Sequence, residues 1–508
     1  MPPPPPPFSL SALLPTSKYP AHEHLDKVLS ILSTLLPASS APPTGLLFLR
    51  GTPSRLHEDS DQAVAFRQRR AFLYLSGCEL PDCCIVYELG GGGAGAAGDA
   101  SESEASESEA GKRESVGQRQ GESKRRRRST LFIPPVVDAD VVWSGLPTLP
   151  AEALARYDVD AVSDAGEDAL AALLRASPGP IWTLDPSHLP AGVPCASVAA
   201  TPSSPSASAA AAAAAAAVAV ADPALLRRAI DAARVTKTPH ELALLRAASA
   251  VTARAHLAAM RAGRRATHEA QLEAAFHAAC IAAGARTQAY DSIVASGADA
   301  ATLHYVRNDK AIVLGASARD GGDAARRTLN VLVDAGCEVR GYAADVTRTF
   351  PAGGRWSRES RGVYDVVLAM RAASLAMLRA GVRWEDVHAR AHRACIAGLL
   401  ALGILRPGPG GEGEGEGEGE GGGDAEGRED GEDEGEGEDE KRRSGGERLV
   451  ERILASRVST AFFPHGLGHY LGLDTHDTGG RADHADPDPM YRYPVSYTHL
   501  TLPTIYSV

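Results

Sequence analysis

Three low-complexity tracts divide this chain of 508 residues into blocks that carry ordinary hydrophobic patterning. The tracts are 90–128, rich in Gly, Ser, Glu and finally Arg; 203–222, Ser/Pro followed by poly-Ala; and 407–446, mostly Gly and Glu. Such compositions bury too little apolar surface to offset the entropy lost on ordering. We therefore expect all three to be disordered, with folded domains over 18–202 and 223–494 joined by the 203–222 linker.

The block over 18–202 mixes short apolar runs with helical stretches. Glu167 to Arg175 and Ala151 to Arg156 have helical patterning. Runs of apolar residues bounded by Gly, Pro or charge predict buried strands, and they occur at 46–49, 72–75, 84–87 and 130–133. The block is therefore predicted to be an α/β domain, with 90–128 inserted as a surface loop and a disordered Pro-rich tail over 1–17.

Helical patterning dominates the block that follows the linker. Thr238, Pro239 and Glu241 provide an N-cap, a proline at the first helical position and a capping-box acid. They predict a long amphipathic helix that ends near Met260. Further helices are expected over 268–283, 359–378 and 384–402, with strands between them that carry polar residues.

Composition excludes several classes of function. The net charge of −12 comes from the third tract, because residues 411–440 hold sixteen Asp or Glu and one Arg. The remainder is close to neutral, which gives no reason to expect nucleic acid as a partner. No apolar run approaches the length of a membrane span, and the prolines after Met1 do not form a signal peptide. Seven scattered Cys without a CxxC pair indicate reduced thiols and a cytoplasmic location.

Two carboxylates stand in one apolar stretch, Leu329 to Pro351. If the stretch is a hairpin turning about Val339-Arg340, Asp334 lies directly opposite Asp345. Facing residues have Cβ atoms about 5 Å apart, and burying two unpaired carboxylates together is costly. Two divalent cations, about 3.5–4 Å apart in known dinuclear sites, would reverse the repulsion. We therefore predict a metal site here, with an exposed polar face as the alternative.

Histidines are concentrated in a second segment, where His465, His469 and His476 fall within twelve residues among glycines and aromatics. The spacing is not the HExxH zinc helix, because Gly466 occupies the position of the general-base Glu. A structural histidine cluster is the alternative. His304, at the end of a third segment that begins at Tyr290, is a weak signal alone. The helical i, i+4 pair His388 and His392 is expected to lie on a helix surface.

In this order the three segments resemble the pita-bread metallopeptidases, and among them aminopeptidase P of the fungal cytosolic kind. Further likeness is carried by 66–70, 80–83, 132–135 and 143–147 in the first block and by 485–490 near the end. The resemblance implies an α/β amino-terminal domain of the aminopeptidase P type, followed by an α+β pita-bread domain. It also implies an Xaa-Pro aminopeptidase, which releases the first residue of peptides that have proline at position two.

The resemblance also implies roles for particular residues. A site with two Mn²⁺ ions would have one ion held by Asp334, both bridged by Asp345 and the other held by His469. The substrate pocket would be lined by three histidines that stabilise developing charge, namely His304, His465 and His476. Hard oxygen ligands suit manganese, and a water activated by the two cations would be the nucleophile. Prolidase, a dipeptidase of the same fold, and a non-catalytic pita-bread binding protein are the alternatives; a homo-oligomer stays open.

The sequence departs from the family pattern near its end. Two more ligands, both Glu, are implied, one of them in a Thr-x-Glu-Pro-Gly motif, and neither motif occurs. Val495 to Thr504 resembles one reading frame of a transposon-type sequencing adapter, so we expect 495–508 to be an artefact, with a natural divergent tail as the alternative. With three of five ligands and an incomplete carboxyl-terminal domain, the chain as written is expected to be inactive.

Overall fold

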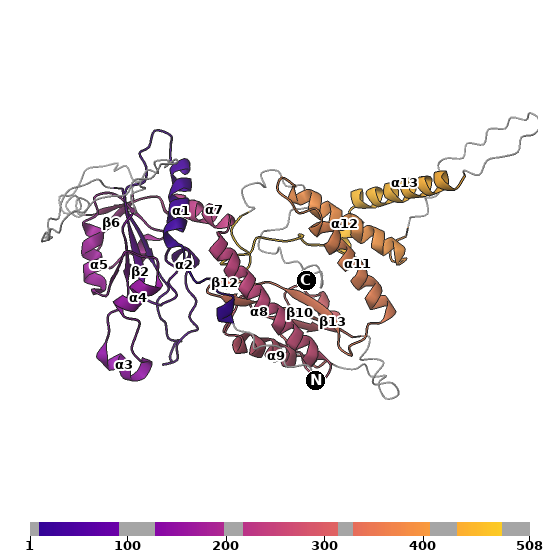
Figure 1. Ribbon diagram of the computed structural model, residues 1–508, viewed down its shortest axis with the longest axis horizontal. Helices are drawn as coiled ribbons and strands as arrows, with labels where there is room; N and C mark the ends of the chain where they lie inside the picture. Colours follow the sequence, from indigo (N-terminus) through magenta and orange to yellow (C-terminus); the bar gives the residue numbers. More distant parts are fainter. Residues whose placement is uncertain (1–9, 91–126, 198–216, 313–328, 407–433, 480–508) are drawn as a thin grey trace, which may run out of the picture. The chain divides into compact units, whose positions relative to one another are not determined.

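A computed structural model describes residues 10–90, 127–197, 217–312, 329–406 and 434–479 (Figure 1). The chain divides into two compact units, one over Thr16–Thr236 and the other over Lys237–Val508 with Met1–Pro15. Most of the three low-complexity tracts, and the suspected artefact at 495–508, lie outside the described residues. Among the residues that are described, no helix combines the length and apolar character that a membrane crossing requires.

The first unit is built on a seven-stranded mixed sheet with the strand order β4-β3-β2-β1-β5-β7-β6. The antiparallel pairs are β1–β2 and β2–β3, and the other pairs are parallel. The strands are β1 Gly45–Arg50, β2 Cys84–Leu89, β3 Ser129–Phe132, β4 Ala161–Ser163, β5 Ile181–Trp182, β6 Cys195–Ser197 and β7 Val218–Val220.

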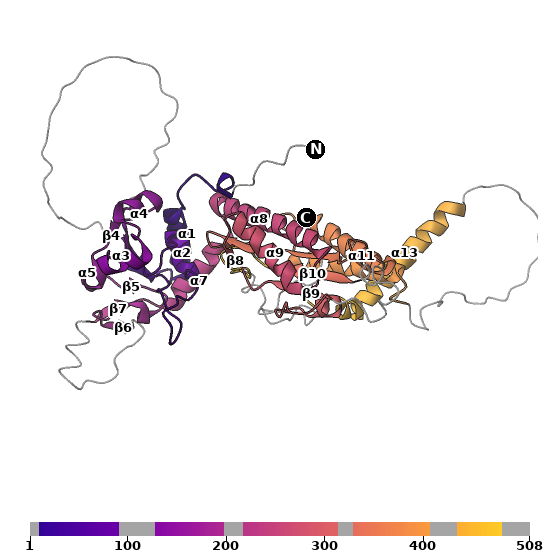
Figure 2. The same cartoon turned by 90° about the horizontal axis from the view of Figure 1, so that it is seen from below.

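Helices cover both faces of this sheet. The helices are α1 Ala21–Leu35, α2 Arg70–Ser76, α3 Asp138–Ser144, α4 Pro150–Arg156, α5 Gly166–Arg175 and α7 Pro223–Val235. Helix α5 packs through Leu170 and Leu174 against Phe48 of β1. On β2, Tyr87 points to the opposite face and donates a hydrogen bond to the Leu75 carbonyl of α2. The predicted α/β architecture is therefore confirmed (Figure 2).

One predicted strand of this unit is wrong. Residues 72–75 lie in helix α2, which ends at Gly77 in the left-handed conformation. Every residue from Phe72 to Ser76 is buried, so this helix has no polar face. A short apolar run with no polar alternation fits a buried helix and a buried strand equally well, and here the helix forms.

The boundary between the two blocks also differs from the expectation. Residues 218–220, inside the expected linker, form β7 with Val218 and Val220 buried and Ala219 exposed. Helix α7 buries Leu226 and Ile230 and packs on α1. The segment through Thr236 therefore belongs to the first unit. A three-residue strand directly after poly-Ala is too short to give a periodic signal.

The second unit contains two three-stranded antiparallel sheets, β13-β10-β9 and β12-β11-β8. Its helices α8 and α9 lie side by side against these strands in both views (Figures 1 and 2). The strands are β8 Thr287–Gln288, β9 Ile293–Ser296, β10 Asn330–Asp334, β11 Cys337–Val339, β12 Tyr342–Ala343 and β13 Thr347–Pro351. The helices are α8 Pro239–Gly263, α9 Glu269–Ala282, α11 Arg358–Leu375, α12 Trp384–Ala401 and α13 Glu434–Ala455.

The predicted capping box at the start of α8 is present. The Thr238 hydroxyl accepts a hydrogen bond from the Glu241 backbone N–H at 3.3 Å. The Glu241 carboxylate accepts one from the Thr238 N–H at 2.8 Å and another from the Tyr342 hydroxyl at 3.1 Å. The cap therefore fixes where the helix begins and also ties it to β12.

The expected end of the Gly/Glu tract at 446 is wrong, because helix α13 already begins at Glu434. Acidic residues come first in the helix sequence, from Glu434 to Glu440, and Lys441 to Arg443 follow. The last turn carries Arg452, a basic residue that complements the helix dipole. Leu454 near the other end is buried, and a packed helix extends outward at little cost once its first turn has formed.

Candidate metal centre

The two acidic residues of the 329–351 stretch lie where the hairpin passes from one sheet to the other. Strand β10 pairs with β13, which places Asp334 opposite Thr347. Strand β11, which follows β10, pairs with β12, which places Glu338 opposite Ala343. The predicted register, with Asp334 directly opposite Asp345, is therefore wrong by two residues. The turn is made by Arg340 and Gly341, both with positive φ (49° and 82°), as a two-residue hairpin turn of the primed type requires.

The bend forms where the two segments of the hairpin approach each other closely, at Gly336 and Ala344. A Cβ atom on this glycine would stand 1.7 Å from the Ala344 carbonyl oxygen. Backbone hydrogen bonds continue on both sides of it, from Ala344 N–H to the Cys337 carbonyl at 3.0 Å and from Ala335 N–H to the Val346 carbonyl at 3.2 Å. Asp345 stands between β12 and β13, outside both strands.

The two carboxylates meet despite the shifted register, and Tyr290 joins them. Its hydroxyl lies 2.6 Å from Asp334 Oδ1 and 2.8 Å from Asp345 Oδ1. Asp334 is only 2% exposed. Burial, followed by the charge of Asp345, raises the pKa of Asp334 to about 7, and burial with both carboxylates holds the pKa of Tyr290 well above its usual range. Sequence reasoning assigned no role to Tyr290; its place on the same strand-rich segment as His304 was the only available signal.

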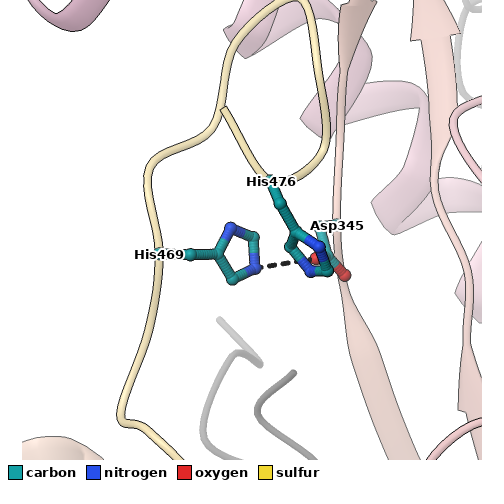
Figure 3. A group of neighbouring side chains, drawn as sticks. All are labelled: Asp345, His469 and His476. Carbon is teal, nitrogen blue, oxygen red and sulfur yellow. Dashed lines mark hydrogen bonds and ion pairs between the residues drawn. The ribbon is translucent and has the colours of Figure 1, made fainter. Parts of the chain in front are cut away.

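Two histidines reach Asp345 from one loop of the 462–477 segment (Figure 3). His469 Nε2 lies 3.1 Å from Asp345 Oδ2, and its Nδ1 donates to the Tyr470 carbonyl at 2.9 Å. His476 stands edge-on to His469, with ring centroids 4.4 Å apart. Asp345, His469 and His476 each offer a ligand atom, and these atoms lie within 4.8 Å of one another.

The two rings carry different charge preferences. Burial opposes protonation of His469, but the hydrogen bond to Asp345 and its negative charge outweigh it and raise the pKa of this imidazole. Burial, followed by the charge of His469, lowers the pKa of His476 to about 4. His476 is therefore held in its neutral form, whereas protonation of His469 is favoured by the neighbouring Asp345 carboxylate.

The other two predicted pocket histidines lie differently. His304 is exposed, and its charge acts on His476, which places it beside this group. His465 is buried at 4% exposure, with its ring 4.9 Å from that of Phe463. The structure therefore gathers Asp334, Asp345, His469 and His476, with His304 at the margin, while His465 packs toward helix α12.

The expectation that the helical pair His388 and His392 lies on a surface is wrong. Both side chains are buried, at 6% and 1% exposure. Their Nε2 atoms are 3.1 Å apart, and His392 Nδ1 lies 3.0 Å from the Ser459 hydroxyl. The face of α12 that carries them packs on Phe463. The i, i+4 spacing of two polar side chains predicts a solvated face, but the two imidazoles are hydrogen-bonded to each other inside the core.

Helix α8 supports the bend from behind with three residues spaced four apart. His256 Nε2 lies 3.1 Å from the Ala335 carbonyl. The Thr252 hydroxyl accepts from the Cys337 N–H at 3.1 Å, and the Cys337 thiol lies 3.5 Å from the Ala248 carbonyl. Burial lowers the pKa of His256 to about 4. A neutral imidazole can therefore donate to the backbone right beside Asp334.

The donor set fits divalent metal ions. Buried Asp334 and partly exposed Asp345 are close enough to share one hydroxyl, so their carboxylates repel each other unless protons or cations intervene. Carboxylate oxygens with one or two imidazoles suit Mn²⁺, Zn²⁺ and related ions, and the Nδ1 hydrogen bond of His469 directs its Nε2 toward Asp345. Cys337 is turned toward α8 and takes no part in the group.

Comparisons with known proteins identify the family of the chain. The profile of metallopeptidase family M24 matches residues 243–493, and that of the aminopeptidase P N-terminal domain matches 24–105. Probable Xaa-Pro aminopeptidases of Pyricularia oryzae and Aspergillus fumigatus are both 38% identical over 94% of this chain and over 79% and 80% of their own lengths.

Solved structures show the same fold. Zn-substituted E. coli aminopeptidase P in complex with product, and the same enzyme with the inhibitor Pro-Leu, each match with a TM-score of 0.59 and 22% identity, over 91% of this chain and 83% of theirs. The amino-terminal α/β domain and the pita-bread domain expected from the sequence are thereby confirmed. The chain belongs to metallopeptidase family M24, as a member of its aminopeptidase P group with the characteristic N-terminal domain.

Proposed function

We propose that the protein to which this chain belongs is a dinuclear, metal-dependent Xaa-Pro aminopeptidase with Mn²⁺ as its cofactor. The observation that carries the proposal is the pair of buried Asp334 and partly exposed Asp345, joined by Tyr290 and faced, at Asp345, by His469. Two carboxylates this close repel each other unless protons or cations intervene, so a metal-free binding protein would gain nothing from the pair. The fungal relatives named probable Xaa-Pro aminopeptidases support the choice of substrate.

Asp334, Asp345 and His469 would hold the metal. When bound, the ions would act as Lewis acids that activate water and polarise the scissile carbonyl. His476, neutral because burial lowers its pKa to about 4, can hydrogen-bond an uncharged peptide group beside them. Exposed His304 stands where a substrate could be contacted. Because an Xaa-Pro bond has no N–H and a fixed φ, contacts of this kind must come from groups that recognise the carbonyl.

The two Glu ligands implied by the family pattern do not occur in a recognisable motif. We therefore propose that the 508-residue chain binds Mn²⁺ weakly and hydrolyses peptides slowly or not at all. A chimera that continues from Pro494 with the matching carboxyl-terminal segment of the Aspergillus fumigatus relative should bind tightly and hydrolyse. If the unmodified chain already cleaves at the rate of the chimera, the two Glu ligands are not required for hydrolysis and this proposal is wrong.

Peptide assays with the chimera test the function itself. Ala-Pro-Ala should release alanine in the presence of Mn²⁺, and Ala-Ala-Ala should not. Asp345→Asn should abolish both metal binding and turnover, while Asp365→Asn, in an exposed ion pair with Arg361 on α11, should leave both unchanged. Cleavage of Ala-Pro alone would identify a prolidase, and binding of Ala-Pro-Ala without cleavage would identify a non-catalytic protein.

We also propose a cytoplasmic location. All seven cysteines are free thiols, six of them buried, as suits a reducing compartment. A fluorescent fusion would test this, and accumulation of the fusion in the secretory pathway would contradict it.

A further inference from the structure

A buried ion pair lies directly behind the loop that carries His469 and His476. Lys237 Nζ lies 2.7 Å from Asp477 Oδ2, and the two side chains are 9% and 1% exposed. Burying a lysine and an aspartate this completely is costly unless the pair is well placed. Residues 240 positions apart in sequence are therefore joined at one point, next to the proposed metal site.

The absence of a side chain at Gly472 leaves room for this ion pair. A Cβ atom on Gly472 would stand 2.1 Å from Asp477 Oδ2 and 3.0 Å from Lys237 Cε. The same glycine accepts a hydrogen bond from the Ala343 N–H at 2.9 Å through its carbonyl. The loop is thus fastened to β12, two residues before Asp345, at the position where the ion pair presses against it.

The Tyr470 carbonyl links the ion pair to the proposed metal ligand. It accepts hydrogen bonds from His469 Nδ1 at 2.9 Å and from the Asp477 backbone N–H at 3.0 Å. The Tyr470 ring also lies over the Lys237 ammonium, at 5.8 Å. Displacing Asp477 would therefore move the acceptor that sets the orientation of the His469 ring.

We propose that Lys237 and Asp477 are positioning residues, which lock the loop so that His469 Nε2 faces Asp345 and His476 stands across it. The proposal deepens the function proposed above and rests on His469 being a metal ligand. The lock acts through geometry: the ion pair fixes Asp477, its backbone fixes the Tyr470 carbonyl, and that carbonyl holds His469 Nδ1–H. Hydrogen-bond partners of metal-binding histidines typically change metal affinity by roughly 10–100-fold when removed.

Four variants of the 508-residue chain and one control variant separate positioning from stability. Lys237→Met and Asp477→Asn each remove one charge, and the double variant should be no worse than either alone if the two act as a unit. Gly472→Ala forces the pair apart while both charges remain. Asp365→Asn, in the exposed pair on α11, is the control for loss of an ordinary ion pair.

Two measurements decide the matter. Histidine ¹⁵N NMR of chelator-treated protein should show a protected Nδ1–H of His469, assigned with His469→Gln, that is lost in the Lys237, Asp477 and Gly472 variants and kept in the control. Calorimetric titration with Mn²⁺ should show affinity weaker by roughly 10-fold or more in the same variants.

The outcomes distinguish this proposal from the proposed function. If melting temperatures fall while the His469 Nδ1–H signal and Mn²⁺ affinity stay as in the wild type, the pair is only structural and the proposal is wrong. If the chimera that continues from Pro494 binds no Mn²⁺, the proposed function fails, while the NMR signal of the 508-residue chain still shows whether the ion pair orients His469.

Discussion

Replacing Gly336 by alanine tests whether the bend between the two small sheets depends on the close approach of Gly336 to Ala344 in the same hairpin. The new Cβ would stand 1.7 Å from the Ala344 carbonyl oxygen, whereas contacts below 3.0 Å essentially do not occur. The strands must therefore separate by more than about 1 Å, since a carbonyl oxygen in a paired backbone cannot turn aside.

The cost follows from the hydrogen bonds at this position. Ala344 N–H to Cys337 (3.0 Å), Ala335 N–H to Val346 (3.2 Å) and Ala289 N–H to the Gly336 carbonyl (2.8 Å) would all be strained or lost. Each buried backbone bond contributes about 1 kcal/mol net, and more when its partner is left unsatisfied. We expect the variant to lose about 3–5 kcal/mol of unfolding free energy.

Urea unfolding combined with hydrogen-exchange mass spectrometry of peptides over 330–351 would measure the change. Gly446→Ala is the matched control, because its Cβ meets nothing within 4 Å on helix α13, and alanine in a helix is neutral or favourable by up to ~1 kcal/mol. A Gly336→Ala chain within about 0.5 kcal/mol of wild type, a size typical of unremarkable surface changes, with unchanged exchange over 330–351, would refute the reasoning.

Two further perturbations address the buried polar groups. Tyr290→Phe removes the hydroxyl shared by Asp334 and Asp345; at pH 8 in the presence of a chelator it should cost about 1–3 kcal/mol, the penalty for unsatisfied buried groups, and an unchanged melting temperature would contradict this. The pKa of His256 is lowered by burial to about 4, so its neutral form stabilises the fold above the ordinary histidine pKa of about 6.5, and that stability is lost as the pH falls from 6.5 toward 4. His256→Gln should reduce the loss of unfolding free energy between pH 6.5 and pH 4 by up to ~3 kcal/mol, measured by thermal unfolding at a series of pH values. Equal acid sensitivity in both proteins would show that His256 titrates normally.

Much of the architecture could be predicted from the sequence because its local signals are strong. The capping box at Thr238 and Glu241 fixed the start of α8, since its two hydrogen bonds are encoded within four residues. The apolar run in helix α2 predicts a strand, because every residue from Phe72 to Ser76 is buried and the polar face that distinguishes a helix is absent. In both cases the outcome depends on how much of the environment is written into the local pattern.

The site was foreseen in its membership more reliably than in its geometry. Asp334, Asp345 and His469 do lie together, but the register joining the first two was set two residues away from the observed one. The turn lies at Arg340 and Gly341, which have positive φ. Asp334 pairs with Thr347 instead of Asp345, and the Tyr290 hydroxyl lies between the two carboxylates. The burial of His388 and His392 could not be read from spacing, because it depends on Phe463 and Ser459, more than sixty residues later.

The shared hydroxyl of Tyr290 has a consequence for how the protein matures. Tyr290 and Asp345 are 55 positions apart in sequence, whereas His469 follows Asp345 by 124 positions and is synthesised later. During that interval the acidic pair has a donor but no imidazole beside it. The Tyr290 hydroxyl thus offers the two carboxylates a hydrogen-bond donor that does not depend on the later histidine loop.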